Sequence, residues 1–120
     1  MIVLFNRYKA SRRLRNRFRS YIRRAIFRAA GVLPVGTWSH LPYTPTQLGK
    51  HLENQFQEGM TWANWGNKEG CWSIDHIYPK SKLVYDSTSH PNFRICWALK
   101  NLRPMWHEDN LAKGASIPDE

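Results

Sequence analysis

Apolar residues recur at intervals of three and four over residues 8–30, and this spacing places them along one stripe of a helix. The residues of this stripe are Leu14, Phe18, Tyr21, Ile22, Ala25, Ile26 and Ala29. Arginines occupy the other faces, and Gly31 followed by Pro34 indicates where the helix ends. The pattern predicts a basic amphipathic helix, which we expect to form an arm over residues 1–33.

A second helix is predicted after a short connection. Residues 34–43 contain two prolines and a glycine, so we expect them to form a linker. Thr44, Pro45 and Gln47 then fit the N-cap, first and third positions of a capping box. The inward-facing residues of the helix would be Leu48, Leu52 and Phe56. We expect this helix to continue to about Gln57 and to act as scaffold.

The C-terminal half predicts a hairpin followed by a helix. Alternating residues over 71–78 predict a first strand closed by Pro79, and residues 101–105 predict the second strand. The other expected elements are a polar loop over 80–90, a short helix from residue 89 carrying Phe93, Cys96 and Trp97 on one side, and a helix over 106–113 closed by Gly114. We therefore assign 44–116 to one domain and 117–120 to a frayed tail.

Positive charge is concentrated at the N-terminal end of the chain. The formal net charge is +9, yet residues 1–50 hold eleven Lys or Arg and no carboxylate, while the remainder has a net charge of −2. Basic residues four apart on one helix repel one another, and a polyanion relieves that repulsion. We therefore expect the arm to contact phosphate groups. The arginines assigned to this contact are Arg12, Arg13, Arg15, Arg17, Arg19, Arg23, Arg24 and Arg28.

The same segment has three alternative interpretations. It can be an ordinary solvated cationic face above a core stripe, or an amphipathic helix on an anionic membrane surface. Its composition also overlaps with that of a mitochondrial transit peptide. The first five residues form too short an apolar run for a signal-peptide core or a membrane span.

The aromatic and sulfur residues bear on the core and on metal binding. Trp62 and Trp65 lie in a turn-rich stretch where they can stack on bases, but in a domain this small we expect them to pack inside. Cys71 and Cys96 form no C-x-x-C motif, so we expect neither a structural zinc nor a disulfide framework. Both cysteines fit small core residues in a reducing cytosol.

Four polar residues offer the chemistry of phosphodiester cleavage. This reaction needs a base that activates water, and positive charge where the phosphorane becomes negative. His76 can act as the base, while the oxygens of Asp75 and Asn110 can hold a hard divalent cation. Taken singly, an Asp-His pair is often a surface pair, and Asn101 or Asn110 can be a turn or polar helix residue. The joint pattern is what indicates catalysis.

These residues belong to three longer stretches. They are Trp72-Ser-Ile-Asp75-His76-Ile-Tyr-Pro79, Cys96-Trp-Ala-Leu-Lys-Asn101-Leu-Arg-Pro-Met105 and Asp109-Asn110-Leu-Ala-Lys113-Gly114. Here the chain resembles the HNH (ββα-metal) nuclease family, specifically its small phage-type members. Residues 51–66 also look like the lead-in of those proteins, but the likeness does not reach the basic arm. The resemblance implies an α+β fold with a ββα-metal core, to which the scaffold helix and the basic N-terminal helix are added.

The resemblance also implies a role for each residue. Asp75 would be a metal ligand, His76 the general base, and Asn101 the residue that holds the loop of the base in place. Asn110 stands where the last His of the family name usually lies and would be the second metal ligand, which makes the chain an H-N-N variant. Lys113 would contact phosphate. The implied cofactor is one Mg²⁺ or Mn²⁺ ion, since carboxylate, amide and water are hard ligands.

Two features near the closing helix bear on the resemblance to HNH nucleases. Family members braced by zinc carry cysteines near the start of this helix, where this chain has Trp106 and Asp109. We therefore expect the tryptophan-rich core to replace the zinc. His107 lies three residues before Asn110 and is an additional candidate ligand or phosphate contact, with a capping or surface role as the alternative.

The leading hypothesis is a metal-dependent DNA endonuclease that nicks DNA or cuts both strands, in a phage, prophage or homing context. If phage-encoded, it would act in the cytoplasm of a bacterial host cell. Its partner would be DNA, and we expect it to bind no membrane. The alternative is a non-catalytic nucleic-acid-binding protein or one associated with phage packaging proteins. Because the basic arm would lie outside the catalytic unit, truncation before Gly31 should separate DNA binding from cutting.

Overall fold

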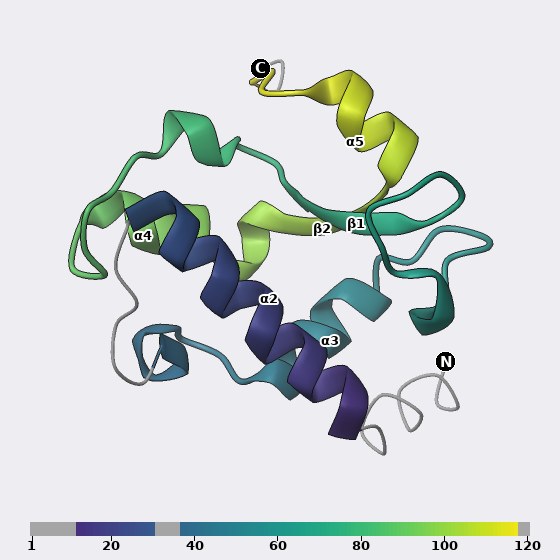
Figure 1. The fold of residues 1–120 in the computed structure, drawn as a ribbon, viewed down its shortest axis with the longest axis horizontal. Coiled ribbons are helices and arrows are strands. Elements are labelled where there is room, and N and C mark those ends of the chain that lie inside the picture. Colours follow the sequence, from purple (N-terminus) through teal and green to yellow (C-terminus); the bar gives the residue numbers. More distant parts are fainter. Residues whose placement is uncertain (1–11, 31–36, 118–120) are drawn as a thin grey trace.

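The computed structural model describes residues 12–30 and 37–117 and shows an α+β fold (Figure 1). The elements are α2 (Arg12–Ala30), α3 (Pro45–Glu53), α4 (Pro91–Cys96), α5 (His107–Lys113), β1 (Trp72–His76) and β2 (Leu102–Trp106), with short 3₁₀ turns η1 (Thr37–His40), η2 (Trp62–Asn64), η3 (Lys80–Lys82) and η4 (Leu99–Asn101). The predicted α+β class is thus confirmed. Within the described part of the chain, no helix combines the length and apolar character needed to span a bilayer.

The sheet is a two-stranded antiparallel hairpin. Asp75 lies opposite Arg103, and His76 lies opposite Leu102. Strand β1 is shorter than predicted. Strand β2 keeps its predicted length but begins one residue later, because Leu99–Asn101 form a 3₁₀ turn before it. Pro104 is tolerated in β2 because each strand of a two-stranded sheet keeps one unpaired edge, where a missing N–H costs no ladder hydrogen bond.

Aromatic side chains fill the centre of the molecule. Trp65 stacks on Trp72 with ring centroids 5.7 Å apart, and Phe18 lies 4.8 Å from Trp65. Trp62, Trp65 and Trp72 are all buried. The prediction that Trp62 and Trp65 pack inside is therefore confirmed. Cys71 and Cys96 are also buried and form no disulfide.

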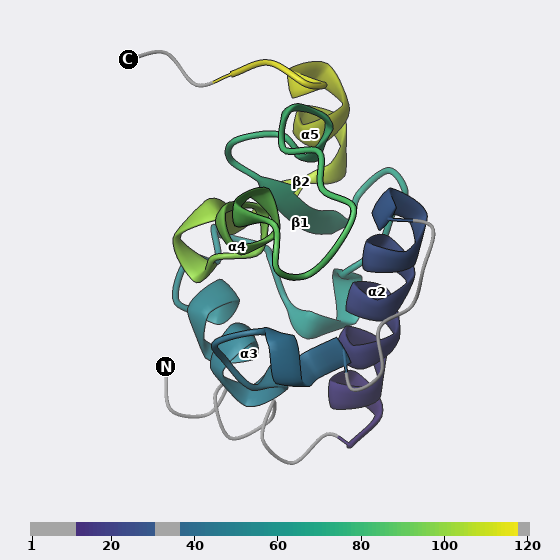
Figure 2. The same ribbon diagram turned by 90° about the vertical axis from the view of Figure 1, so that its left-hand side faces the viewer.

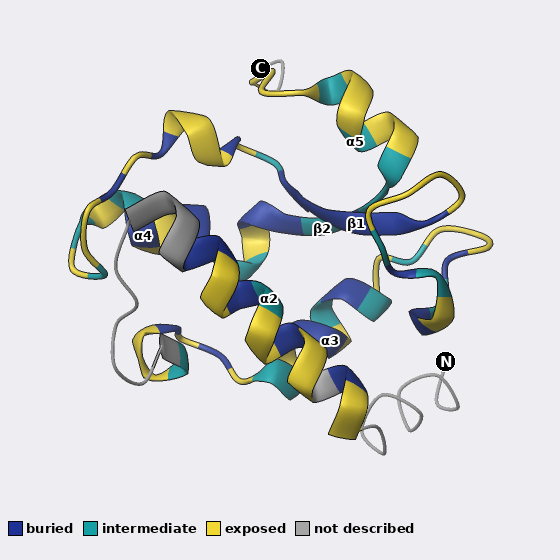
Figure 3. Ribbon diagram, viewed as in Figure 1, coloured by how far each residue is buried: buried dark blue, intermediate teal, exposed yellow. Residues whose placement is uncertain are grey.

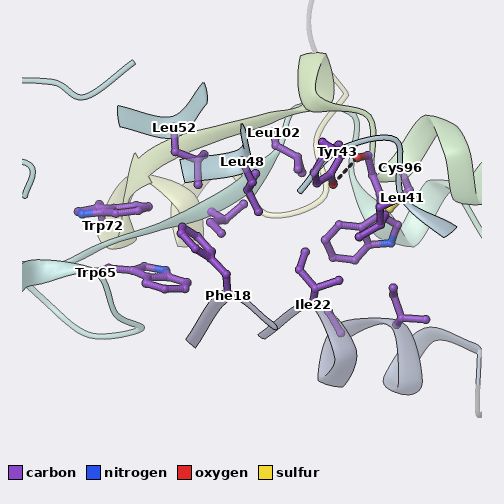
Figure 4. Close-up of a cluster of buried hydrophobic side chains, with 14 of the residues drawn as sticks. Phe18, Ile22, Leu41, Tyr43, Leu48, Leu52, Trp65, Trp72, Cys96 and Leu102 are labelled. Atoms are coloured by element: carbon purple, nitrogen blue, oxygen red, sulfur yellow. Dashed lines mark hydrogen bonds between the residues drawn. The ribbon is translucent and has the colours of Figure 1, made fainter. Parts of the chain in front are cut away.

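Helix α2 is part of this same core. Figure 3 shows buried and exposed residues alternating along it, and Figure 4 shows Phe18 and Ile22 pointing from it toward Leu48 of α3. Phe18, Ile22 and Ile26 are fully buried. The predicted apolar stripe is correct for the described side chains, but the interpretation as an arm outside the globular unit is wrong. The predicted start at Tyr8, the end at Gly31 and the side chain of Ala29 lie outside the described residues.

The predicted linker is also structured where the structure describes it. Residues 37–40 form a 3₁₀ turn, and Leu41 and Tyr43 are buried. The hydroxyl of Tyr43 donates a hydrogen bond of 2.6 Å to the carbonyl of Trp97 (Figure 4). Residues 37–43 are therefore packed against the domain rather than forming a spacer. Residues 34–36 are not described.

The capping box of α3 forms as predicted. The Thr44 hydroxyl accepts a hydrogen bond from the Gln47 N–H, and the Gln47 side chain accepts one from the Thr44 N–H. The helix ends at Glu53, four residues earlier than expected. Phe56 lies in the turn that follows and still packs 5.1 Å from Trp72. The predicted short helix with Phe93, Cys96 and Trp97 is confirmed as α4 and its cap. Of the predicted tail, only Ile117 is described, and it is exposed.

Candidate functional site

Helix α5 packs on one face of the hairpin and brings the predicted residues together. Alternate residues of a strand face the same side, so Ser73 and Asp75 share a face of β1. The Asn110 side-chain amide donates a hydrogen bond of 2.9 Å to the Ser73 hydroxyl. Lys113, one turn later on α5, contacts Asp75 and donates to the backbone carbonyl of His76 at 3.1 Å. Asp75, Asn110 and Lys113 therefore lie along one surface between β1 and α5.

The carboxylate of Asp75 is buried between two cations. Only 3% of its side chain is exposed, with Arg103 Nε at 2.8 Å and Lys113 Nζ at 3.3 Å. A buried carboxylate needs such partners because the loss of water around a charge is costly. Arg103 was not predicted as a site residue. Its pairing follows from the strand register, which places it opposite Asp75.

His76 lies on the other side of the strand from Asp75. Its ring packs edge-on against Trp97, with centroids 4.6 Å apart, and only 5% of the residue is exposed. No described residue hydrogen-bonds to Nε2 of His76, and this atom is buried. Burial lowers the pKa of His76 to about 3, with Lys80 and Lys113 adding to the effect. The imidazole is therefore neutral at physiological pH, and in this buried state it is a weak base.

Asn101 connects the end of β1 to the turn before β2. Its amide oxygen accepts a hydrogen bond of 2.7 Å from the Tyr78 N–H, and its amide nitrogen donates to the carbonyls of Tyr78 and Cys96 at 3.2 and 3.0 Å. In addition, the Ile77 N–H donates to the Asn101 carbonyl at 2.8 Å. These contacts fix the segment that directly follows His76.

Two residues can offer oxygen ligands to a cation. Among the residues that the structure describes, no group of three or more His, Cys, Asp or Glu side chains gathers to hold a metal. A cation would therefore rely on Asp75, Asn110 and water. The Asn110 hydrogen bond to Ser73 uses its nitrogen, which leaves the amide oxygen out of that bond. A carboxylate offers about four acceptor positions, and Arg103 and Lys113 each occupy one at Asp75. The donor types thus fit Mg²⁺ or Mn²⁺.

The other predicted residues are distributed over two elements. Arg12, Arg13, Arg19, Arg23 and Arg24 are exposed along α2, and the side chains of Arg15 and Arg28 lie outside the described part. Arg17 is instead engaged with Trp65, whose carbonyl accepts its hydrogen bond at 3.0 Å and whose ring lies 4.3 Å from the guanidinium carbon. His107 is half-buried at the start of α5, and none of the described residues bonds to its buried Nδ1.

The burial of His76 predicts a pH-dependent stability. The unfolded imidazole takes up a proton near pH 6.5, whereas the folded one does so only near pH 3. The stabilisation by neutral His76 is therefore complete above pH 6.5 and decreases as the pH falls toward 3. We expect the wild-type free energy of unfolding to fall by about 1.4 kcal/mol per pH unit more than that of His76→Gln.

Urea unfolding in EDTA between pH 6.5 and 4.5 measures this difference. The exposed His40 provides the matched control, because His40→Gln should keep the wild-type slope. Equal slopes in wild type and His76→Gln would show that His76 is accessible to protons in the folded state.

Comparison with known proteins adds one similar sequence. The chain is 36% identical over 70 residues, 58% of its length, to the uncharacterized protein L426 of Acanthamoeba polyphaga mimivirus. It spans 29% of the length of that relative. No family model matches the chain. No solved structure matches it either.

Proposed function

We propose that the protein is a metal-dependent DNA endonuclease of the HNH type. The observation that carries the proposal is the surface between β1 and α5, where Asp75, Asn110 and Lys113 lie along one face while Asn101 fixes the segment after His76. These are the residues that the resemblance to HNH nucleases assigns to the reaction. Their placement on a hairpin followed by a helix supports a ββα-metal core.

The proposed reaction is hydrolysis of a phosphodiester by an activated water. His76 accepts a proton from the water. Because burial lowers its pKa to about 3, this step requires that the entry of water and substrate restore the basicity of the imidazole. Asp75 and Asn110 would hold one Mg²⁺ or Mn²⁺ ion, which would stabilise negative charge on the phosphate and the leaving oxygen. Lys113 and Arg103 are cations beside the same carboxylate and add to this stabilisation. Because Nε2 is buried against solvent in this structure, substrate binding has to open a path for water to the imidazole.

A non-catalytic nucleic-acid-binding or packaging-associated protein is the second candidate. The observation that favours it is the saturation of the site: Asp75 is already paired with two cations, and His76 packs against Trp97. Such a protein would use the exposed arginines of α2 for phosphate contacts and keep the β1–α5 contacts for stability alone. It would not need a metal ion.

Conversion of supercoiled plasmid distinguishes the two candidates. The wild type should produce nicked or linear DNA in Mg²⁺ or Mn²⁺ and none in EDTA. Asn110→Ala should raise the metal concentration for half-maximal cleavage by at least about tenfold, because even the loss of a residue that only orients a metal ligand costs about 10–100-fold. Asp109→Asn, on the exposed neighbouring position of α5, is the matched control and should cut like wild type. A plasmid left supercoiled in every metal would favour the non-catalytic protein.

A further inference from the structure

A groove of about 930 Å³ separates α2 from the hairpin and α5. One wall is made by α2 and includes Arg12, Arg13 and Tyr21. The opposite wall includes Ser73 of β1 and Asn110 of α5. Ser73 and Asn110 are the residues whose hydrogen bond joins β1 to α5 beside Asp75. The groove therefore leads from the basic helix to the candidate metal ligand.

The charge of the groove has one sign. Four arginines of α2 and Lys80 line it, and no carboxylate is among its described lining residues. Arg17 is engaged with Trp65, and Arg12, Arg13 and Arg17 are all exposed. Cations gathered in a concave surface focus their potential and attract an anionic ligand. The groove thus fits a ligand with several negative charges.

The exposed arginines of α2 fall into two groups. Arg12, Arg13, Arg17 and Arg24 line the groove, while Arg19 and Arg23 are exposed on the same helix outside it. A helix that only supplied diffuse positive charge would use both groups equally. A ligand seated in the groove would depend on the first group alone.

The size and lining of the groove favour one strand of nucleic acid over a duplex. Its volume lies within the range of small-ligand pockets, about 300–1,000 Å³, which suits a few nucleotides. A double helix is wider than its own major groove, which is about 12 Å across, and so exceeds what a groove of about 930 Å³ can enclose. Tyr21 is half-buried on the α2 wall, where its aromatic ring lies edge-on to Trp65 and lines the groove together with the arginines. A cationic groove with an aromatic side chain is the usual arrangement for binding single strands.

We propose that this groove binds a short stretch of single-stranded nucleic acid, with its phosphates on Arg12, Arg13 and Arg24 and one end at Asn110. Cleavage of the strand at Asn110 rests on the proposed function. The groove would place a single strand, or one strand of a locally opened duplex, beside this candidate metal ligand. Binding itself needs neither a metal nor catalysis.

Fluorescence anisotropy with a labelled oligothymidylate in EDTA tests the proposal without cleavage. Arg12→Gln/Arg13→Gln should weaken binding at least tenfold at low salt and reduce the slope of log K against log salt by about 1.4, for two lost phosphate contacts. Arg19→Gln/Arg23→Gln removes the same charge from the same helix and should change both quantities by less than half as much. Thermal unfolding of both double variants should match wild type, since all four side chains are exposed.

Three results would contradict the proposal that this groove binds a single strand. They are equal losses in the two double variants, tighter binding of a duplex of the same length than of the single strand, and no binding of either nucleic acid. These outcomes are separate from those of the plasmid experiment. If binding depends on the groove arginines but the protein cuts no plasmid, the proposed binding site is supported and the proposed nuclease activity is rejected. If the protein cuts plasmid but both double variants lose binding equally, only the proposed binding site is rejected.

Discussion

Deletion of residues 1–30 is expected to unfold the domain rather than to produce a cutting unit with weaker DNA binding. The deletion removes Phe18, Ile22 and Ile26, all fully buried in the common core. Each large apolar side chain contributes about 1.5–3 kcal/mol by burial, and a domain of this kind is stable by only about 5–15 kcal/mol. The truncated chain should therefore lack a cooperative thermal transition in circular dichroism.

A point variant tests the same packing within the full chain. Phe18→Ala should lower the free energy of unfolding by about 3–5 kcal/mol, because it leaves a cavity beside Trp65. Arg19→Ala, at the next and exposed position, is the matched control and should change it by less than about 0.5 kcal/mol. A truncated protein that unfolds cooperatively near the wild-type temperature would restore the interpretation of α2 as a separate arm.

Replacement of Asn101 should affect both stability and cleavage. Asn101→Ala leaves the Tyr78 N–H and the carbonyls of Tyr78 and Cys96 without their side-chain partner. A buried polar group without a partner costs about 1–3 kcal/mol, so we expect the free energy of unfolding to fall by at least about 2 kcal/mol. Plasmid cleavage by the folded fraction should also fall, since the segment after His76 loses its anchor.

Asn101→Asp is the closest matched variant. It keeps an oxygen for the Tyr78 N–H but turns a second, anionic oxygen toward the carbonyls of Tyr78 and Cys96, so its stability and cleavage should be no higher than those of Asn101→Ala. Urea unfolding and plasmid cleavage, measured on the same preparations, give the two quantities. Wild-type stability in Asn101→Ala would mean that these hydrogen bonds are replaced by water at no cost.

Local signals in the sequence predicted much of the fold. The capping box around Thr44 and the apolar stripe with Phe18 and Ile22 were correct because hydrogen-bonding side chains and helical spacing act within a few residues. The surface against which this stripe packs could not be predicted in the same way. A stripe shows which face of a helix is buried, but not whether it packs on its own domain. The burial of Leu41 and Tyr43 was likewise not predicted, because the prolines of this segment indicated a linker.

The candidate site was predictable only in part. The expectation that Asp75 and Asn110 act together came from the resemblance to HNH nucleases, because the periods of a strand and of a helix do not relate residues on two different elements. The pairing of Asp75 with Arg103 depends on the register of a hairpin whose strands are separated by a long connection, and periodicity does not fix that register. The burial of His76 against Trp97 depends on how α4 packs, which no local pattern shows.

The most direct test of the central claim is the single-turnover rate of DNA cleavage in Mn²⁺ by wild type and His76→Ala, at protein concentrations that saturate the DNA. A general base contributes about 10²–10⁴-fold to such a reaction. The proposed function predicts a loss of that size in His76→Ala, with binding of the uncut DNA unchanged. Equal cleavage rates in the two proteins would contradict the assignment of His76 and, with it, the proposed nuclease mechanism.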